Sequence, residues 1–292
     1  MREFDYIAPG TLEEVLEVLS RHSGEARLLA GGTDLICQMK EGLVSPRVVI
    51  SLGRVPALAG IAENGGSGLA IGALATLEEI ATAPLVREQY GALAAAAGQV
   101  GSVQVRNRAT IGGNLCNASP AADAAPPLLV LGATLVAASV RGERRVPVRG
   151  FFAGPNSTVL GEDEVLIEIR LPVPTSASGT AFLKLGRRKA MDIAIVSAAA
   201  YLAVEPGTAT VREARVALGS AAPVPTLVDE VGEVVKGSEL DGASLEEAGR
   251  VAAGRAEPIS DIRASAEYRR QMVHVLVKRA LLQAYAQATR AG

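Results

Sequence analysis

Residues 110–123 read TIGGNLCNASPAAD, in which two adjacent glycines stand between small hydroxyl and amide side chains, and an aspartate follows. A second stretch, LLAGGTDL at 28–35, has the same order of an apolar run, two glycines, a threonine and an aspartate. Glycine permits positive φ and lets another molecule approach the main chain closely. An apolar strand that runs into Gly-Gly therefore exposes successive N–H groups, and such a nest attracts phosphate oxygens.

The polar residues of the two stretches extend this interpretation. Thr33 and Thr110 can add hydroxyl donors, Asn114 can donate its amide, and Asp123 can hold a ribose hydroxyl. Donors to a charged phosphate contribute about 1.5–3 kcal/mol each, so a few of them hold a dinucleotide without any Lys or Arg. A plainer interpretation stays open, because Gly-Gly after a strand is commonly just a turn. Asp34 and Asp123 are also consistent with helix caps.

Composition and motifs exclude several classes of protein. The 292 residues, 49% hydrophobic and 21% charged, are ordinary for a globular protein and long enough for two domains. A net charge of −2 without a basic stripe argues against nucleic-acid binding. Neither a G-x-G-x-x-G helix start nor a P-loop is present. Two cysteines and two histidines offer no metal site, and no residue is predicted to act as a catalytic acid, base or nucleophile.

The pattern along the chain predicts an α+β protein of two domains. Residues 1–55 read as β-α-β, with Thr11 and Glu14 spaced as a capping box. Residues 56–175 alternate short strands with helices, which are expected at 77–81, at 89–97 and from Asp123, whose side chain would cap the helix. After PVPTSASGT, residues 178–288 read as three strands followed by helices near 226–236, 243–255 and 265–289.

At this point the sequence resembles a known family, the FAD-binding subunits of molybdenum hydroxylases such as aerobic carbon monoxide dehydrogenase and bacterial xanthine dehydrogenase. The resemblance covers nearly the whole chain. It rests on the two glycine stretches, FDYIAPGTLEEVLEVL, EVLIEIRLP, AFLKLGRRKAMDIAIVSAA and ISDIRASAEYRRQMVHVLVKRAL. It implies a two-subdomain FAD-binding domain of the p-cresol methylhydroxylase type over residues 1–175. A small C-terminal domain with a three-stranded antiparallel sheet and a helix bundle would follow over 178–288.

The resemblance also implies which residues contact FAD. The first glycine stretch would wrap the pyrophosphate, the second would hold the phosphates from the other side, and Asp123 would reach the adenosine part or its ribose. Leu166 would bring backbone groups to the flavin ring, Val100 would stand where some relatives place an aromatic, and Lys184 would approach from the C-terminal domain. The implied set is Leu29, Ala30, Gly31, Gly32, Thr33, Asp34, Leu35, Val100, Thr110, Ile111, Gly112, Gly113, Asn114, Asp123, Leu166 and Lys184. Cys37 and Cys116 follow the two glycine stretches. Positions near the flavin stay open for them, but we expect small buried side chains.

By the same resemblance the chain is the electron-transfer flavoprotein of a larger oxidoreductase. A large partner subunit would carry the molybdenum-pterin cofactor and a small one the 2Fe-2S clusters, in a dimer of heterotrimers. Two alternatives stay open, a free-standing flavin reductase of the same fold superfamily and a scaffold subunit without flavin. We expect a cytoplasmic protein without a membrane span, because the N-terminus lacks the apolar core of a signal peptide.

Overall fold

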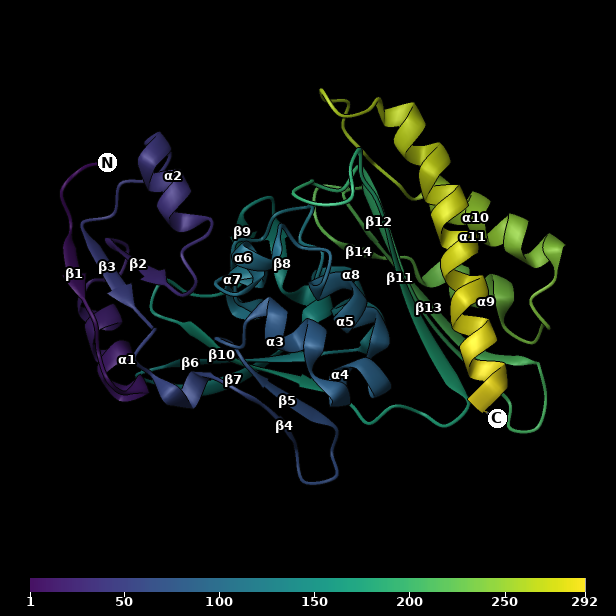
Figure 1. Ribbon diagram of the computed structural model, residues 1–292, viewed down its shortest axis with the longest axis horizontal. Helices are drawn as coiled ribbons and strands as arrows, with labels where there is room; N and C mark the ends of the chain where they lie inside the picture. Colours follow the sequence, from purple (N-terminus) through teal and green to yellow (C-terminus); the bar gives the residue numbers. More distant parts are fainter. Residues whose placement is uncertain (292) are drawn as a thin grey trace.

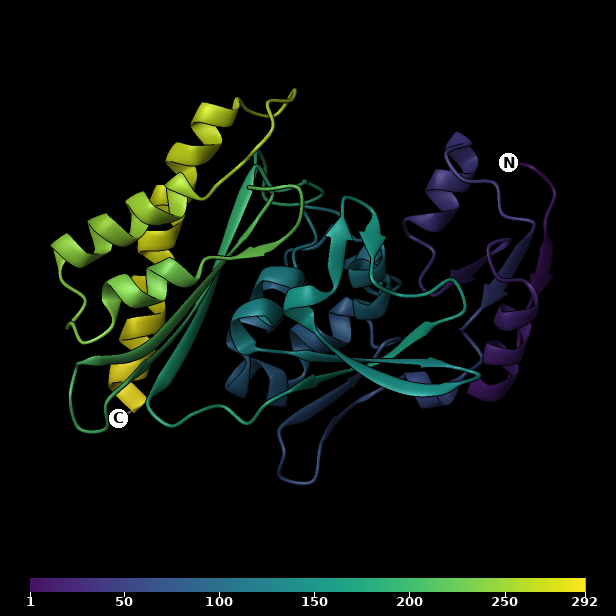
Figure 2. The ribbon, with the colours of Figure 1, turned by 180° about the vertical axis from the view of Figure 1, so that it is seen from behind.

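The computed structural model describes residues 1–291 and shows three units side by side (Figure 1). The N-terminal unit (purple) and the C-terminal helices (green to yellow) lie at opposite ends, and a five-stranded sheet with its helices lies between them. The same arrangement is seen from behind in Figure 2. None of the helices described in residues 1–291 is long and apolar enough to cross a membrane.

The N-terminal unit is a three-stranded parallel sheet with the strand order β1-β3-β2. Thr11 starts its first helix by accepting the Glu14 N–H, and Val15 and Leu19 bury one face of that helix. The predicted β-α-β start is confirmed. The elements are β1 Asp5–Ile7, α1 Leu12–Arg21, β2 Ala26–Leu29, α2 Leu35–Glu41 and β3 Val48–Ser51.

The middle unit is an antiparallel sheet with the strand order β4-β5-β10-β6-β7, whose helices gather on one face (Figure 1). Its strands are β4 Ile61–Glu63, β5 Leu69–Gly72, β6 Thr134–Ser139, β7 Gly142–Pro147 and β10 Val165–Leu171; a small β8–β9 pair (Phe152–Gly154, Ser157–Thr158) lies beside it. Its helices are α3 Leu77–Thr82, α4 Pro84–Gln89, α5 Gly91–Ala97, α6 Val103–Arg106, α7 Ile111–Cys116 and α8 Ala125–Leu131; the short 3-10 turns are Pro56–Leu58 and Val148–Gly150.

One predicted helix in this unit is divided differently. The expected helix at 89–97 begins only at Gly91, and Gln89 ends α4 instead. Tyr90 between them has φ −131° and ψ 46°, which is outside helical geometry. Its ring is buried and its hydroxyl donates to the Pro172 carbonyl over 2.9 Å, so tertiary packing interrupts the helix here.

The C-terminal unit is an antiparallel sheet with the order β11-β12-β13-β14, covered by three helices. The three predicted strands are present, but the sheet has four strands because the two-residue β14 adds to its edge. The elements are β11 Ser178–Leu185, β12 Val196–Val204, β13 Val211–Gly219, β14 Thr226–Leu227, α9 Asp229–Val235, α10 Gly242–Gly254 and α11 Ala266–Ala291.

Strand β12 is buried at all nine positions because the sheet is covered on both faces. Ala199 and Tyr201 belong to the apolar core of the middle unit, whereas Ala200 and Leu202 belong to the core under α9–α11. The alternation of a strand with one wet face is therefore absent from this part of the sequence. The C-terminal sheet packs against α5 and α8 of the middle unit, so residues of both units form the interface between them.

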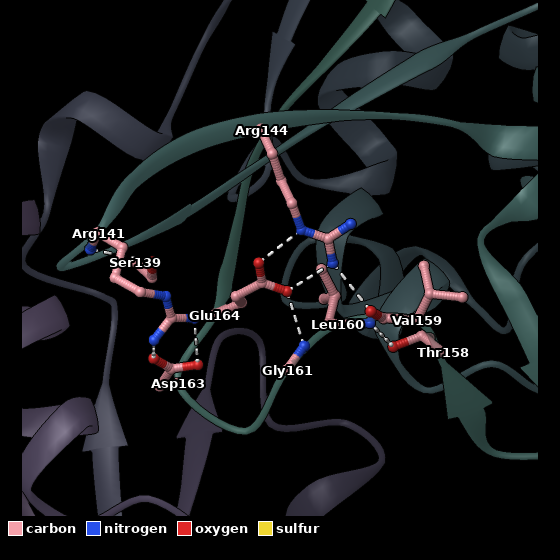
Figure 3. A network of polar contacts seen from close by, with 9 residues as sticks. All are labelled: Ser139, Arg141, Arg144, Thr158, Val159, Leu160, Gly161, Asp163 and Glu164. Atoms are coloured by element: carbon pink, nitrogen blue, oxygen red, sulfur yellow. Dashed lines mark hydrogen bonds and ion pairs between the residues drawn. The ribbon is translucent and has the colours of Figure 1, made fainter.

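A polar network fixes the loop that leads into β10 (Figure 3). The Glu164 carboxylate accepts from Arg144 Nε and Nη2, each over 2.6 Å, and from the Gly161 N–H over 2.7 Å. Arg144 also donates to the Val159 carbonyl over 2.9 Å, and Arg141 pairs with Asp163 beside it. These contacts hold β10, and with it Leu166, in a defined position relative to the β6–β7 hairpin.

Candidate functional site

The first glycine loop joins β2 to α2 and leaves its backbone donors free. Gly32 has φ +78°, in the left-handed region that favours glycine. Within residues 1–291, no hydrogen bond is donated by the N–H groups of Gly31 to Leu35. Five successive free amides at this place are the feature expected of an anion-binding nest.

The second glycine loop is built differently. Thr110 precedes α7, and its hydroxyl accepts the Gly113 N–H over 3.1 Å. The Ile111 and Gly112 amides donate to the Ala75 and Ala73 carbonyls over 3.0 and 2.9 Å. The prediction that both loops expose amides therefore holds only for the first loop, because the amides of the second are bound to the protein's own carbonyls and to a cap.

The two glycine loops lie against each other. A Cβ added at Gly31 would overlap the Arg108 carbonyl oxygen and lie 2.7 Å from its carbon, so only glycine fits there. A Cβ at Gly113 would lie 3.9 Å from the Ala30 Cβ. Farther along, Gln38 of α2 donates to the Asn117 side chain over 3.1 Å. The structure thus brings together the two stretches that the sequence singled out, about 80 residues apart.

Two buried polar atoms near the loops have no partner. Asn114 Oδ1 and Asp123 Oδ1 are inaccessible and accept no hydrogen bond from the residues described. Such unsatisfied atoms are uncommon in folded proteins, so each is a candidate contact for a bound molecule. The other Asp123 oxygen is paired with Lys184 over 2.6 Å.

Two protein families match this chain, one over its N-terminal part and the other over its C-terminal part. Residues 2–174 match the family described as "FAD binding domain in molybdopterin dehydrogenase". Residues 181–284 match the "CO dehydrogenase flavoprotein C-terminal domain". The chain belongs to the FAD-binding subunits of the molybdopterin dehydrogenases.

Individual members of the family are similar over almost their full length. The putative xanthine dehydrogenase FAD-binding subunit of Escherichia coli is 33% identical over 97% of this chain and 96% of the relative. The carbon monoxide dehydrogenase medium chain of Hydrogenophaga pseudoflava is 34% identical over 97% of each chain. The solved carbon monoxide dehydrogenase of that organism superposes with a TM-score of 0.94 at 33% identity, covering 98% of both chains. Quinoline 2-oxidoreductase from Pseudomonas putida 86 superposes with a TM-score of 0.91 at 32% identity, covering 98% of both.

These findings confirm the predicted family and its α+β fold, and they make this FAD-binding protein an oxidoreductase component. The role of each individual residue stays a prediction. FAD fits the observed site, because free amides and a glycine that packs on backbone suit a diphosphate. Asn114 Oδ1 and Asp123 Oδ1 are also available to accept hydrogen bonds from hydroxyl groups.

Asp123 does not cap α8 as the sequence predicted. The residue before α8 is Ala124, and no side chain caps this helix. The Asp123 carboxylate instead turns to Lys184 of β11, which also donates to the Gln99 carbonyl over 3.2 Å. An ion pair with a residue 61 positions away replaces the local hydrogen bond. Burial raises the pKa of Asp123 to about 6, although the Lys184 ammonium lowers it.

The remaining predicted residues lie around these groups. Leu166 is buried next to an irregularity in the β10–β6 pairing. An extra residue of β10 interrupts the regular hydrogen-bond ladder there. Val100 is half-buried and follows Gln99, so it is close in the chain to the Lys184 contact. Sequence reasoning did not single out Gln99 or Arg108, because each contributes a backbone carbonyl, which any residue possesses.

Two cavities lie at the junction of the domains. The larger, about 850 Å³, is bounded by the linker at 172–178, Tyr90 and Tyr201, away from the glycine loops. The smaller, about 420 Å³, is bordered by Lys184, Gln99 and the loop after β11. The smaller cavity is thus the one that adjoins the candidate site.

The two cysteines are not buried as expected. Cys37 of α2 and Cys116 of α7 are both exposed. Each short helix buries a neighbouring residue instead, Met39 in α2 and Leu115 in α7.

Proposed function

We propose that this chain is the electron-transfer subunit of a molybdenum-dependent hydroxylase. It would take electrons from 2Fe-2S clusters in a small partner subunit and pass them to an external acceptor. A large subunit with the molybdenum-pterin cofactor would complete a heterotrimer, two of which would pair. The observation that carries this proposal is the row of free amides from Gly31 to Leu35, in a chain similar to its relatives over almost their full length.

The amides of the first loop would hold the FAD pyrophosphate. Each donor to a charged phosphate contributes about 1.5–3 kcal/mol, so a few of the five suffice for tight binding. Thr33 would add its hydroxyl, and Leu29, Ala30 and Asp34 would shape the entrance to the loop. No cation is needed there, because aligned backbone dipoles supply the positive potential.

The second loop would contribute side chains and shape. Since its amides are already bound, Asn114 is the group with hydrogen-bonding capacity left. Gly112 and Gly113 would keep this surface flat. The Ile111 and Gly112 amides anchor the loop to the Ala75 and Ala73 carbonyls, and Thr110 holds the Gly113 N–H. Asp123, paired with Lys184, would accept a hydroxyl of the nucleotide, and Leu166 and Val100 would border the flavin ring.

FAD, when bound, supplies the redox chemistry, since flavin accepts electrons singly and releases them in pairs. The chain's own task is to bind the nucleotide, orient its ring and limit water around it. This task requires no side chain that transfers a proton. The absence of this requirement agrees with a site made mainly of backbone groups and aliphatic side chains.

Purification of the chain after expression alone, and of the native protein from the cells that produce it, tests this function. We expect the purified chain to show the two absorption bands of oxidised flavin and to copurify with a large and a small subunit. Absence of flavin under all conditions would favour the scaffold alternative. Bleaching of the isolated flavoprotein by a nicotinamide nucleotide, without any partner subunit, would favour the reductase.

A further inference from the structure

The Asp123–Lys184 pair connects the two domains through buried charges. Asp123 lies between α7 and α8 of the FAD-binding domain, and Lys184 lies in β11 of the C-terminal domain. Only 6% of the Asp123 side chain and 8% of the Lys184 side chain are exposed. Burial of either charge alone would be strongly unfavourable, so each side chain depends on the other domain for its partner.

The pair uses only one of the two carboxylate oxygens. Lys184 Nζ contacts Oδ2 over 2.6 Å and the Gln99 carbonyl over 3.2 Å. Oδ1 is buried and accepts no hydrogen bond from any residue in 1–291. A carboxylate held in this way presents one oriented, unoccupied acceptor, and an ionised acceptor forms stronger hydrogen bonds than a neutral one.

We infer that Lys184 is a positioning residue for FAD that acts through Asp123. It occupies Oδ2 and keeps the carboxylate ionised, so that Oδ1 remains to accept a hydroxyl group of the bound nucleotide. This inference rests on the proposed FAD site. It adds that a residue of the C-terminal domain controls how tightly the FAD-binding domain retains its cofactor.

The charges around Asp123 give this arrangement a pH dependence. Burial raises the pKa of Asp123 to about 6, and Lys184 is the charged neighbour that lowers it. The loop after β11 adds Arg187, Arg188, Lys189 and Asp192, which border the 420 Å³ cavity together with Lys184. Without the Lys184 ammonium, burial acts unopposed, so the pKa of Asp123 rises further and the carboxyl is protonated nearer neutral pH.

The test is FAD affinity of the full chain between pH 5 and 8.5, measured from flavin fluorescence for the wild type and three variants. Wild-type affinity should fall below about pH 6, by at most tenfold per pH unit, as Asp123 takes up a proton. In Lys184→Met the midpoint should move up by about two pH units, with a loss of about tenfold at pH 7 and recovery to within about threefold at pH 8.5. Asp123→Asn should bind more weakly and show no pH dependence in this range.

The double variant separates this role from direct contact. If Lys184 acts through Asp123, Asp123→Asn with Lys184→Met should bind FAD within about threefold of Asp123→Asn alone. Losses that multiply, or a Lys184→Met profile with the wild-type midpoint, would overturn the inference while leaving FAD binding itself established. Failure of the wild type to bind FAD at any pH would overturn both.

Controls keep the result interpretable. Lys236→Met removes an exposed lysine of the C-terminal domain that does not border the 420 Å³ cavity, and it should retain the wild-type profile. Circular dichroism of each variant reports whether it is folded. Should Lys184→Met fail to fold, the Asp123→Asn profile still decides, because a midpoint near pH 6 in that variant would contradict the role of Asp123.

Discussion

Gly31→Ala is expected to abolish FAD retention, with a loss of affinity of at least about a hundredfold, or roughly 2.7 kcal/mol. The new methyl group would overlap the Arg108 carbonyl oxygen, and backbone cannot swing aside as a long side chain can. The first loop would therefore move away from the second, and the amides from Gly31 to Leu35 would lose their shared direction. Loss of two hydrogen bonds to a charged phosphate accounts for an effect of this size. Flavin absorbance per chain after gel filtration measures it.

A matched variant separates a local from a general effect of adding a methyl group. A Cβ at Gly53 would lie 3.6 Å from the Ser51 hydroxyl, an ordinary contact in an exposed turn. Gly53→Ala should keep full flavin content, and Gly31→Ala should lose it with a stability cost of only about 1–3 kcal/mol. Full flavin content in Gly31→Ala would show that the two loops do not form the pyrophosphate site.

Arg269→Met is expected to destabilise the C-terminal domain by about 3 kcal/mol, which lowers Tm by roughly 10 °C. Arg269 is 3% exposed and lies in the first turns of α11. Its guanidinium donates to the Ile195 and Ser220 carbonyls and, over 2.7 Å, to Asp261. A methionine of similar length fills the space but leaves these three acceptors without a cation. Thermal unfolding followed by circular dichroism measures the loss.

The pH dependence of this loss follows from Asp261. Burial alone would raise the pKa of Asp261, but hydrogen bonds from the Arg263 N–H and from the Arg263 and Arg269 side chains lower it well below its usual value. A lowered pKa means that the stabilisation is present above the unfolded pKa of about 3.9 and disappears as pH falls through the folded pKa. The difference between wild type and Arg269→Met should thus be constant from pH 5 to 8 and shrink below about pH 4.

Arg279→Met provides the control for this prediction. Arg279 lies on the same helix and is exposed. Its replacement should change the free energy of unfolding by no more than about 0.5 kcal/mol. Equal losses in the two variants would mean that helix propensity, and not the buried guanidinium, explains the effect.

The features that the sequence predicted correctly are governed by neighbouring residues. Gly-Gly after an apolar run specifies a tight loop, and the Thr11–Glu14 spacing specifies a helix start. The same local logic failed at Asp123. A carboxylate just before a helix is a good cap, but here a distant lysine competes for it successfully.

Two other features differ from the sequence-based expectation because distant parts of the chain determine them. The second glycine loop contains the same kinds of residues as the first, yet the Ala73 and Ala75 carbonyls accept hydrogen bonds from its amides. Their position follows from how the segment after β5 packs, which no spacing within 110–114 reveals. The run at 196–204 shows no alternation of apolar and polar residues, because both faces of β12 are covered. The sequence therefore does not reveal which of its residues face the middle unit and which face α9–α11.

Amide hydrogen exchange of the full chain with and without FAD tests the FAD site most directly. We predict that the amides of residues 31–35 exchange rapidly in the free chain and at least about tenfold more slowly with FAD bound. The amides of residues 111–113 already have acceptors in the protein and should change much less. Bound FAD that protects 111–113 and leaves 31–35 unprotected would contradict the proposed site.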